Sequence, residues 1–224
     1  MTARPTTLKA VIFDLDGTLV DTADEFVVVV QALRAEHGHG PMDPARIRAS
    51  VSNGARALVS LGLGIAEDSD GFETQRLRLL ELYTEVLGSV ARPYPGIDKL
   101  IAEFEQRGIG WGIATNKPRL YTEPLLARLD MRPAPASVVC PDDVGERKPH
   151  PESLLRNCSD LGCSPAQAIY VGDHLRDIEA GRRAGMHTIA AAYGYIEPGD
   201  DPRSWGADAH ANDSTELYRL ILGE

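Results

Sequence analysis

Short apolar runs that alternate with amphipathic segments restrict the fold of this chain of 224 residues more than any other feature. The apolar runs predict strands at residues 10–13, 110–114, 137–140, 168–171 and 187–191. Helical periodicity lies between and after them, near residues 97–106, 120–129, 152–161, 178–184 and 215–222. This alternation is typical of a parallel sheet with helices on its faces. We therefore predict an α/β fold with a Rossmann-like parallel-sheet core.

Residues 22–91 interrupt the alternation, because their pattern is helical and contains no convincing strand. Thr22 and Glu25 have the T-x-x-E spacing of a capping box, which predicts that a helix begins there. An all-helical domain is thus expected directly after the first strand. The predicted domains are a Rossmann-like core, residues 1–20 and 93–224, and an inserted helical domain, residues 21–92.

Charge and composition argue against several classes of partner. The chain has 23 Lys and Arg against 33 Asp and Glu, which gives a net charge of −10. Such a surface repels phosphate backbones and anionic lipids, so we expect neither a nucleic-acid nor a membrane partner. Asp14 interrupts the apolar stretch near the N-terminus before a signal sequence can form. We expect a cytoplasmic monomer or homodimer that acts on a small molecule.

Acidic residues follow two of the predicted strands. The run DLDGT starts at Asp14, after the first strand, and GDHLRD, with Asp173 and Asp177, follows the fourth. The carboxyl ends of parallel strands meet at one edge of a sheet, so three or four carboxylates should converge. At about 4 Å and an effective dielectric constant near 20, each pair repels by roughly 4 kcal/mol. A hard divalent cation relieves this repulsion, and ligands that are all oxygen favour Mg²⁺.

Two lysine-containing segments could bind a phosphate beside that cation. Thr115, Asn116 and Lys117 follow the second predicted strand, and Lys148 precedes a helix that starts near Pro151. Either Lys alone would most often be a solvated surface residue. Their positions beside two acidic strand ends make phosphate binding the better interpretation.

These motifs, in this order, resemble those of the haloacid dehalogenase superfamily over nearly the whole chain. The four motifs are DLDGT at Asp14, the strand ending in Thr115, Lys148, and GDxxxD from Asp173 to Asp177. The helical insertion resembles the cap domain of that family. The resemblance implies an Mg²⁺-dependent phosphatase, a phosphoric monoester hydrolase that forms an aspartyl phosphate.

The resemblance also implies a role for each matching residue. Asp14 would be the nucleophile and Asp16 the general acid and base, a role in which acidic neighbours should help Asp16 to hold its proton. Dehalogenating relatives have no acid at the position of Asp16, so its presence favours phosphate chemistry. The implied metal ligands are Asp14, Asp16 through its backbone carbonyl, and Asp173, with Asp177 in support. The implied phosphoryl-binding residues are Thr115, Asn116 and Lys148.

Residues 48–56 lie in a break between helical patterns and carry Ser52, Asn53 and Arg56. They form either an exposed turn between helices or a segment over the active site, where Arg56 could bind a substrate carboxylate. Here the chain resembles phosphoglycolate phosphatases. More narrowly, SNGAR, TNKP, CPDD, AYGYI and WGAD resemble bacterial N-acetylmuramic acid 6-phosphate phosphatases, which act in cell-wall sugar recycling. Both substrates carry a carboxylate as well as a phosphate.

Three alternatives stay open beside N-acetylmuramic acid 6-phosphate hydrolysis. They are phosphoglycolate hydrolysis, a phosphosugar mutase with the same core, and a phosphoaspartate signalling receiver. His174 stands where many phosphatase relatives have a small hydroxyl residue, and we expect it beside the metal ligands or facing solvent.

Overall fold

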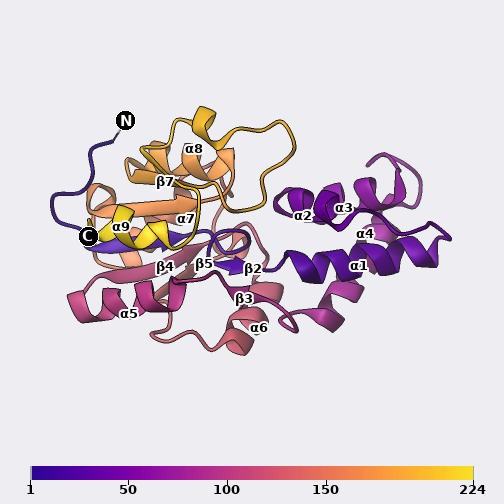
Figure 1. The fold of residues 1–224 in the computed structure, drawn as a ribbon, viewed down its shortest axis with the longest axis horizontal. Helices are drawn as coiled ribbons and strands as arrows, with labels where there is room; N and C mark the ends of the chain where they lie inside the picture. Colours follow the sequence, from indigo (N-terminus) through magenta and orange to yellow (C-terminus); the bar gives the residue numbers. More distant parts are fainter. Residues whose placement is uncertain (1, 224) are drawn as a thin grey trace.

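The computed structural model describes residues 2–223 and contains a six-stranded sheet with helices on both faces (Figure 1). The strand order is β5-β4-β1-β6-β7-β8, and every neighbouring pair is parallel. The strands are β1 (Ala10–Phe13), β4 (Gly110–Ala114), β5 (Ser137–Val139), β6 (Ala168–Gly172), β7 (His187–Ala191) and β8 (Ala209–Ala211). The predicted Rossmann-like α/β fold is confirmed. The edge strand β8 was not predicted.

Each predicted segment of helical periodicity after residue 96 overlaps one helix of the structure. These helices are α5 (Ile97–Arg107), α6 (Arg119–Leu129), α7 (Glu152–Asp160), α8 (Leu175–Ala184) and α9 (Glu216–Leu222). Short 3₁₀ helices lie between them, namely η2 (Pro141–Asp143), η3 (Pro165–Gln167) and η4 (Pro202–Trp205). No helix within residues 2–223 is both long and apolar enough to cross a membrane.

The central strand β1 is buried on both of its faces. Ala10 and Ile12 belong to an apolar cluster with residues of α7 and α8. Val11 and Phe13 alternate with them and pack in a larger cluster with residues of α5 and α9. In Figure 1, α8 lies above the sheet and α5 below it. This double burial fixes the carboxyl end of β1, where Asp14 follows, in the middle of the sheet edge.

A helical insertion, residues 22–91, separates two short antiparallel strands, β2 (Val20–Asp21) and β3 (Arg92–Pro93). Its helices are α1 (Ala23–Glu36), α2 (Pro44–Ser50), η1 (Val51–Asn53), α3 (Gly54–Leu63) and α4 (Phe72–Val86). The insertion lies to one side of the sheet in Figure 1. The ends of the insertion fall at β2 and β3, next to the predicted domain boundaries.

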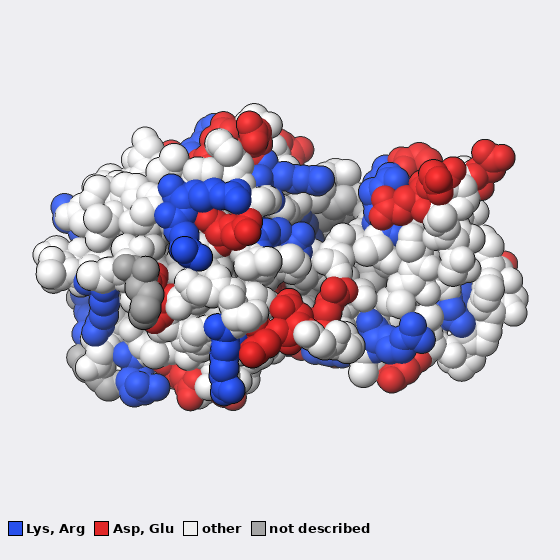
Figure 2. Space-filling view, turned by 90° about the horizontal axis from the view of Figure 1, so that it is seen from above, with Lys and Arg blue, Asp and Glu red and all other residues white. Residues whose placement is uncertain are grey.

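The molecular surface carries charges of both signs. On the face seen in Figure 2, Lys and Arg side chains lie among Asp and Glu side chains, and no continuous basic area covers that face. This mixture accords with the net charge of −10.

Helix α1 begins at Ala23, but the predicted capping box is wrong. The Thr22 hydroxyl donates instead to Oδ1 of Asp16, over 2.6 Å. Oε1 of Glu25 accepts the backbone N–H groups of residues 90 and 91, over 3.2 and 3.1 Å. Glu25 therefore links the first turn of α1 to the segment that leads into β3. Thr22 and Glu25, which the T-x-x-E spacing had assigned to a capping box, thus form tertiary hydrogen bonds instead.

Tyr195, in the loop after β7, caps α1 in their place. Its hydroxyl accepts the N–H groups of Thr22 and Ala23, over 2.7 and 2.9 Å, and donates to Oδ1 of Asp21. The backbone N–H of Tyr195 donates to Oδ2 of Asp173, over 2.9 Å. One residue therefore connects the start of the helical insertion to the acidic end of β6.

We expect Tyr195→Phe to lower the free energy of unfolding by about 1–3 kcal/mol, because it leaves the buried N–H of Thr22 without its acceptor. The N–H of Ala23 keeps a second acceptor, Oδ1 of Asp21, over 3.1 Å. Thr22 and Ala23 are fully buried, so water cannot replace the hydroxyl. Urea unfolding followed by circular dichroism measures the change. Equal stability of wild type and variant would contradict the capping role.

Candidate active site

Three carboxylates meet at the carboxyl edge of the sheet. Asp14 follows β1, Asp173 follows β6, and Asp177 lies in the first turn of α8. One oxygen atom of each carboxylate lies within 4.8 Å of the others, and Asp173 and Asp177 are buried. The structure thus brings together three of the four acidic residues predicted for the site.

Burial and mutual repulsion disfavour the ionised forms of two of these groups. Burial raises the pKa of Asp14 to about 6, although Lys148 acts to lower it. Burial raises the pKa of Asp173 well above its usual range, and the charges of Asp14 and Asp177 add to this effect. The cluster therefore carries more negative charge than one lysine compensates. Its oxygen donors fit a hard divalent cation such as Mg²⁺.

Lys148 is buried between the nucleophile candidate and the helix end. Its Nζ lies 2.9 Å from Oδ1 of Asp14 and 2.8 Å from Oδ1 of Asp177. It also donates to the backbone oxygen of Ala114 and to the hydroxyl of Tyr170, over 2.8 and 2.9 Å. Burial alone would lower the pKa of Lys148, but the two carboxylates raise it. Lys148 is thus a fixed cation next to the oxygen that would attack a phosphate.

Thr115 and Asn116 follow β4, beside this cluster. The Thr115 hydroxyl accepts the backbone N–H of Lys117, and the Asn116 amide donates to the backbone oxygen of Lys148, each over 3.1 Å. Both residues line the same cavity as Asp14. The structure therefore places Thr115 and Asn116, like Lys148, at the cavity where we had predicted phosphoryl binding.

Asp16 has a different environment from the one expected. Lys117 Nζ lies 2.9 Å from Oδ1 and 3.2 Å from Oδ2 of Asp16, and Thr22 donates to Oδ1. The charged group that contacts Asp16 is thus a cation, whereas we had expected acidic neighbours. The side chain of Asp16 lies outside the cluster of three carboxylates.

We had considered Lys117 for phosphate binding, but in the structure it connects Asp16 to the helical insertion. Its ammonium lies 5.4 Å from the ring centroid of Phe26 in α1 and 4.8 Å from that of Tyr83 in α4. Burial alone would lower its pKa, but the charge of Asp16 raises it. The TNKP motif pointed to this position. The two rings come from distant parts of the chain, so spacing could not reveal the contact.

The segment around η1 lies over the acidic cluster. Ser52 donates to Oδ2 of Asp173 over 3.2 Å, and Asn53 donates to Oε1 of Glu197 over 2.6 Å. Arg56 lines the cavity, but its Nε already donates to Oε2 of Glu67, over 2.6 Å. Of the three predicted residues, Ser52 contacts the cluster directly.

His174 caps α8. Its Nδ1 accepts the N–H of Arg176, and Oδ2 of Asp177 accepts the N–H of His174, each over 3.1 Å. Burial and the charge of Arg176 lower the pKa of His174, which favours the neutral ring that this acceptor role requires. The imidazole of His174 is thus the N-cap of α8, a position that Ser or Thr occupies in many helices.

A cavity of about 740 Å³ opens between the sheet edge and the helical insertion. Asp14, Thr115 and Lys148 line it from the sheet, and Phe26 and Tyr83 line it from the insertion. A volume in this range is typical of sites for small molecules.

Comparison with known proteins defines the class of this enzyme. Residues 11–191 match the haloacid dehalogenase-like hydrolase family, and the chain belongs to that family. The predicted enzyme class, a phosphoric monoester hydrolase, is confirmed by relatives that are named as phosphatases. A signalling receiver is excluded, because the family is one of hydrolases.

Two named relatives cover almost the whole chain. An N-acetylmuramic acid 6-phosphate phosphatase from Pseudomonas aeruginosa is 48% identical over 96% of this chain and 95% of its own. A phosphoglycolate phosphatase from Xanthomonas campestris is 37% identical over 94% and 95%, respectively. A crystal structure described as a predicted phosphoglycolate phosphatase from Haemophilus somnus has a TM-score of 0.84 and 23% identity, covering 96% and 98% of the two chains. That last likeness shows the shared fold.

We expect Lys117→Met to lower kcat by about 10- to 100-fold, the usual cost of a misplaced catalytic group. The loss should be smaller with an aryl phosphate, whose leaving group needs no proton from Asp16. Steady-state kinetics on alkyl and aryl phosphates checks this, with Asp16→Asn as the reference and the exposed Lys99→Met as the control. An equal loss on both substrates would argue against action through Asp16.

We also expect MgCl₂ to raise the melting temperature more at about pH 7.5 than at about pH 5. The pKa of Asp14 is raised from 3.8 to about 6, so its stability contribution is fully present below about 4 and is lost as pH rises through 6. A cation restores stability where Asp14 is ionised, whereas at the lower pH it must displace a proton. Thermal unfolding with NaCl of matched ionic strength as the control measures the difference. A larger shift at the lower pH would contradict the acidic-cluster argument.

Proposed function

We propose that this enzyme hydrolyses N-acetylmuramic acid 6-phosphate through an aspartyl phosphate on Asp14, with Mg²⁺ as cofactor. The observation that carries the mechanism is the contact between the buried Lys148 ammonium and Oδ1 of Asp14, at the end of a cavity. The choice of substrate rests on the name of the relative from Pseudomonas aeruginosa and on the volume of the cavity.

The acidic cluster is the proposed cation site. Asp14 and Asp173 would hold Mg²⁺ together with the backbone carbonyl of Asp16, and Asp177 would support them. When bound, the cation neutralises charge between the carboxylates and the substrate phosphate. This explains why the protein tolerates three buried or half-buried carboxylates beside a single ammonium.

Asp14 acts as the nucleophile in the first step. One of its oxygens attacks phosphorus, and the bond between phosphorus and the leaving oxygen breaks. Lys148, with Thr115 and Asn116, holds the phosphoryl oxygens as charge spreads over them. The buried position of Lys148 makes its charge effective, because little water screens it.

Asp16 is the proposed proton donor to the leaving sugar hydroxyl, and it recovers a proton from the water that hydrolyses the aspartyl phosphate. Its oxygens now face Lys117 and Thr22. Asp16 would act after its side chain turns from these partners toward the leaving oxygen. The contacts of Lys117 with Phe26 and Tyr83 would connect this turn to the position of the helical insertion.

We further propose that residues 21–92 form a cap domain over a catalytic core of residues 1–20 and 93–224. Ser52 supports this division, because its hydroxyl reaches Asp173 of the core. Ser52, Asn53 and Arg56 are the cap residues proposed to face substrate.

Phosphoglycolate is the second candidate substrate, and the relative from Xanthomonas campestris favours it. Phosphoglycolate has a two-carbon skeleton, whereas N-acetylmuramic acid 6-phosphate is an acetylated amino sugar with a lactyl side chain. A cavity of about 740 Å³ suits the larger molecule better. A phosphosugar mutase would instead need a bisphosphate activator and would release no inorganic phosphate.

Phosphate release from N-acetylmuramic acid 6-phosphate, phosphoglycolate and 4-nitrophenyl phosphate tests the function. We expect the highest kcat/KM for the first substrate, and Asp14→Asn should abolish turnover because an amide is a poor nucleophile and a poor metal ligand. Asp98→Asn, on the exposed start of α5, is the matched control. Faster hydrolysis of phosphoglycolate would overturn the substrate, and activity above a few per cent in Asp14→Asn would overturn the nucleophile.

A further inference from the structure

Four arginines line the cavity in which the substrate would lie. They are Arg56, Arg76, Arg147 and Arg176. The substrate proposed above carries a carboxylate in addition to its phosphate, and an acidic protein of net charge −10 needs a local cation to bind such a group. An arginine whose charge no protein group matches is therefore the best candidate to bind the carboxylate.

Three of the four arginines already have a protein partner. Arg56 pairs with Glu67, and Arg76 donates through Nε to both carboxylate oxygens of Glu73, over 2.9 and 3.0 Å. Arg176 donates to the backbone oxygen of residue 52. A substrate carboxylate would have to compete with these oxygens for the same N–H groups.

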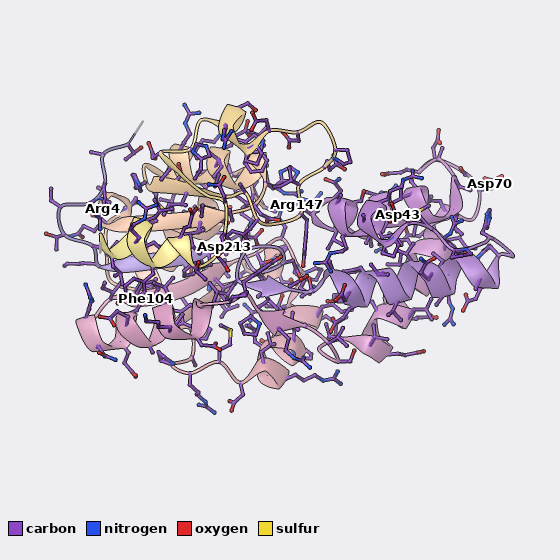
Figure 3. All side chains as sticks on the ribbon, in the orientation of Figure 1. Arg4, Asp43, Asp70, Phe104, Arg147 and Asp213 are labelled. Atoms are coloured by element: carbon purple, nitrogen blue, oxygen red, sulfur yellow. The ribbon has the colours of Figure 1, made fainter. Side chains whose placement is uncertain are left out.

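Arg147 differs from the other three. Within residues 2–223 its guanidinium forms neither an ion pair nor a side-chain hydrogen bond, and the residue is exposed. It directly precedes Lys148, whose ammonium marks the phosphate end of the cavity. Figure 3 labels Arg147 at the junction between the sheet and the helical insertion.

The backbone on either side of Arg147 is held in place. The N–H groups of residues 145 and 146 donate to the two carboxylate oxygens of Glu152, each over 3.0 Å. The backbone oxygen of Lys148 accepts from Asn116. The Arg147 side chain thus starts from a fixed point beside the catalytic lysine, so binding of a ligand orders only the side chain itself.

We propose that Arg147 is a specificity-determining residue that binds the carboxylate of the substrate while Lys148 binds its phosphate. A guanidinium donates two parallel hydrogen bonds to a carboxylate, a geometry that a lysine cannot reproduce. The two neighbouring cations would recognise the two anionic ends of one molecule. This inference rests on the proposed function and assigns to Arg147 the contact that the sequence had suggested for Arg56.

A pair of substrates that differ in one group tests the proposal. N-acetylmuramic acid 6-phosphate and N-acetylglucosamine 6-phosphate share the phosphorylated sugar, but only the first has the lactyl carboxylate. We expect Arg147→Met to lower kcat/KM for the first by roughly 10- to 150-fold, the effect of one charged hydrogen-bonded contact, chiefly through KM. For the second, and for 4-nitrophenyl phosphate, we expect a change within about twofold, because neither uses the contact.

Three further variants sharpen the result. Arg147→Lys should fall between wild type and Arg147→Met, since it keeps the charge without the paired donors. Arg46→Met, an exposed arginine on α2 outside the cavity, controls for loss of charge. Arg56→Met should show the smaller selective loss. A selective loss at Arg56 and none at Arg147, or an equal loss by Arg147→Met on both sugars, would overturn the proposal.

Failure of the proposed substrate would give a different pattern. Wild type would then show no preference for N-acetylmuramic acid 6-phosphate over N-acetylglucosamine 6-phosphate. The same variants are then compared on phosphoglycolate and 2-hydroxyethyl phosphate, which also differ by one carboxylate. A selective loss on phosphoglycolate supports the carboxylate role of Arg147 with another substrate, and no selective loss on either pair overturns it.

Discussion

The geometry of the site depends on the contacts of the buried Lys148 ammonium. Its partners are Asp14 after β1, the backbone oxygen of Ala114 at the end of β4, Tyr170 in β6 and Asp177 in α8. One cation thus joins three adjacent strands and a helix at their functional edge. Loss of one partner of a buried pair costs about 3–5 kcal/mol, so this arrangement holds Asp14, the proposed nucleophile, in place. The remaining negative charge is what makes the site suitable for a divalent cation.

A second set of contacts joins this edge to the helical insertion. Tyr195 binds Asp173 through its backbone and caps α1 through its hydroxyl, while Thr22 at the same helix start donates to Asp16. Lys117 holds Asp16 from the other side and lies over rings of the insertion. A change in the position of α1 therefore reaches Asp16 through two contacts and Asp173 through one. These contacts connect the position of the helical insertion to the side chain of Asp16, the proposed proton donor.

The sequence predicted those strands whose burial on both faces produces a continuous run of apolar residues. The bounds of β1 and β4 agree with the prediction, because strands buried on both faces read as continuous apolar runs. The motif residues at the strand ends also met as expected, since parallel topology brings them to one edge. The strand β8 was missed because Ala209–Ala211 has no β-branched residue and owes its strand to pairing with β7. The capping box failed because Tyr195, which is remote in sequence, supplies the cap.

The proposed site divides substrate recognition between the sheet core and the helical insertion. If the core bound only phosphate, the insertion alone would determine substrate selectivity. The core loop that carries Lys148 also presents Arg147, and the charges of the insertion's arginines Arg56 and Arg76 are matched by glutamates. Under the proposal for Arg147, recognition of the substrate carboxylate would lie on the core loop, whereas the insertion would contribute apolar side chains, the Ser52 segment and arginines that are already paired. Placing both cations on one anchored loop fixes the spacing of the two anionic groups that a substrate must present.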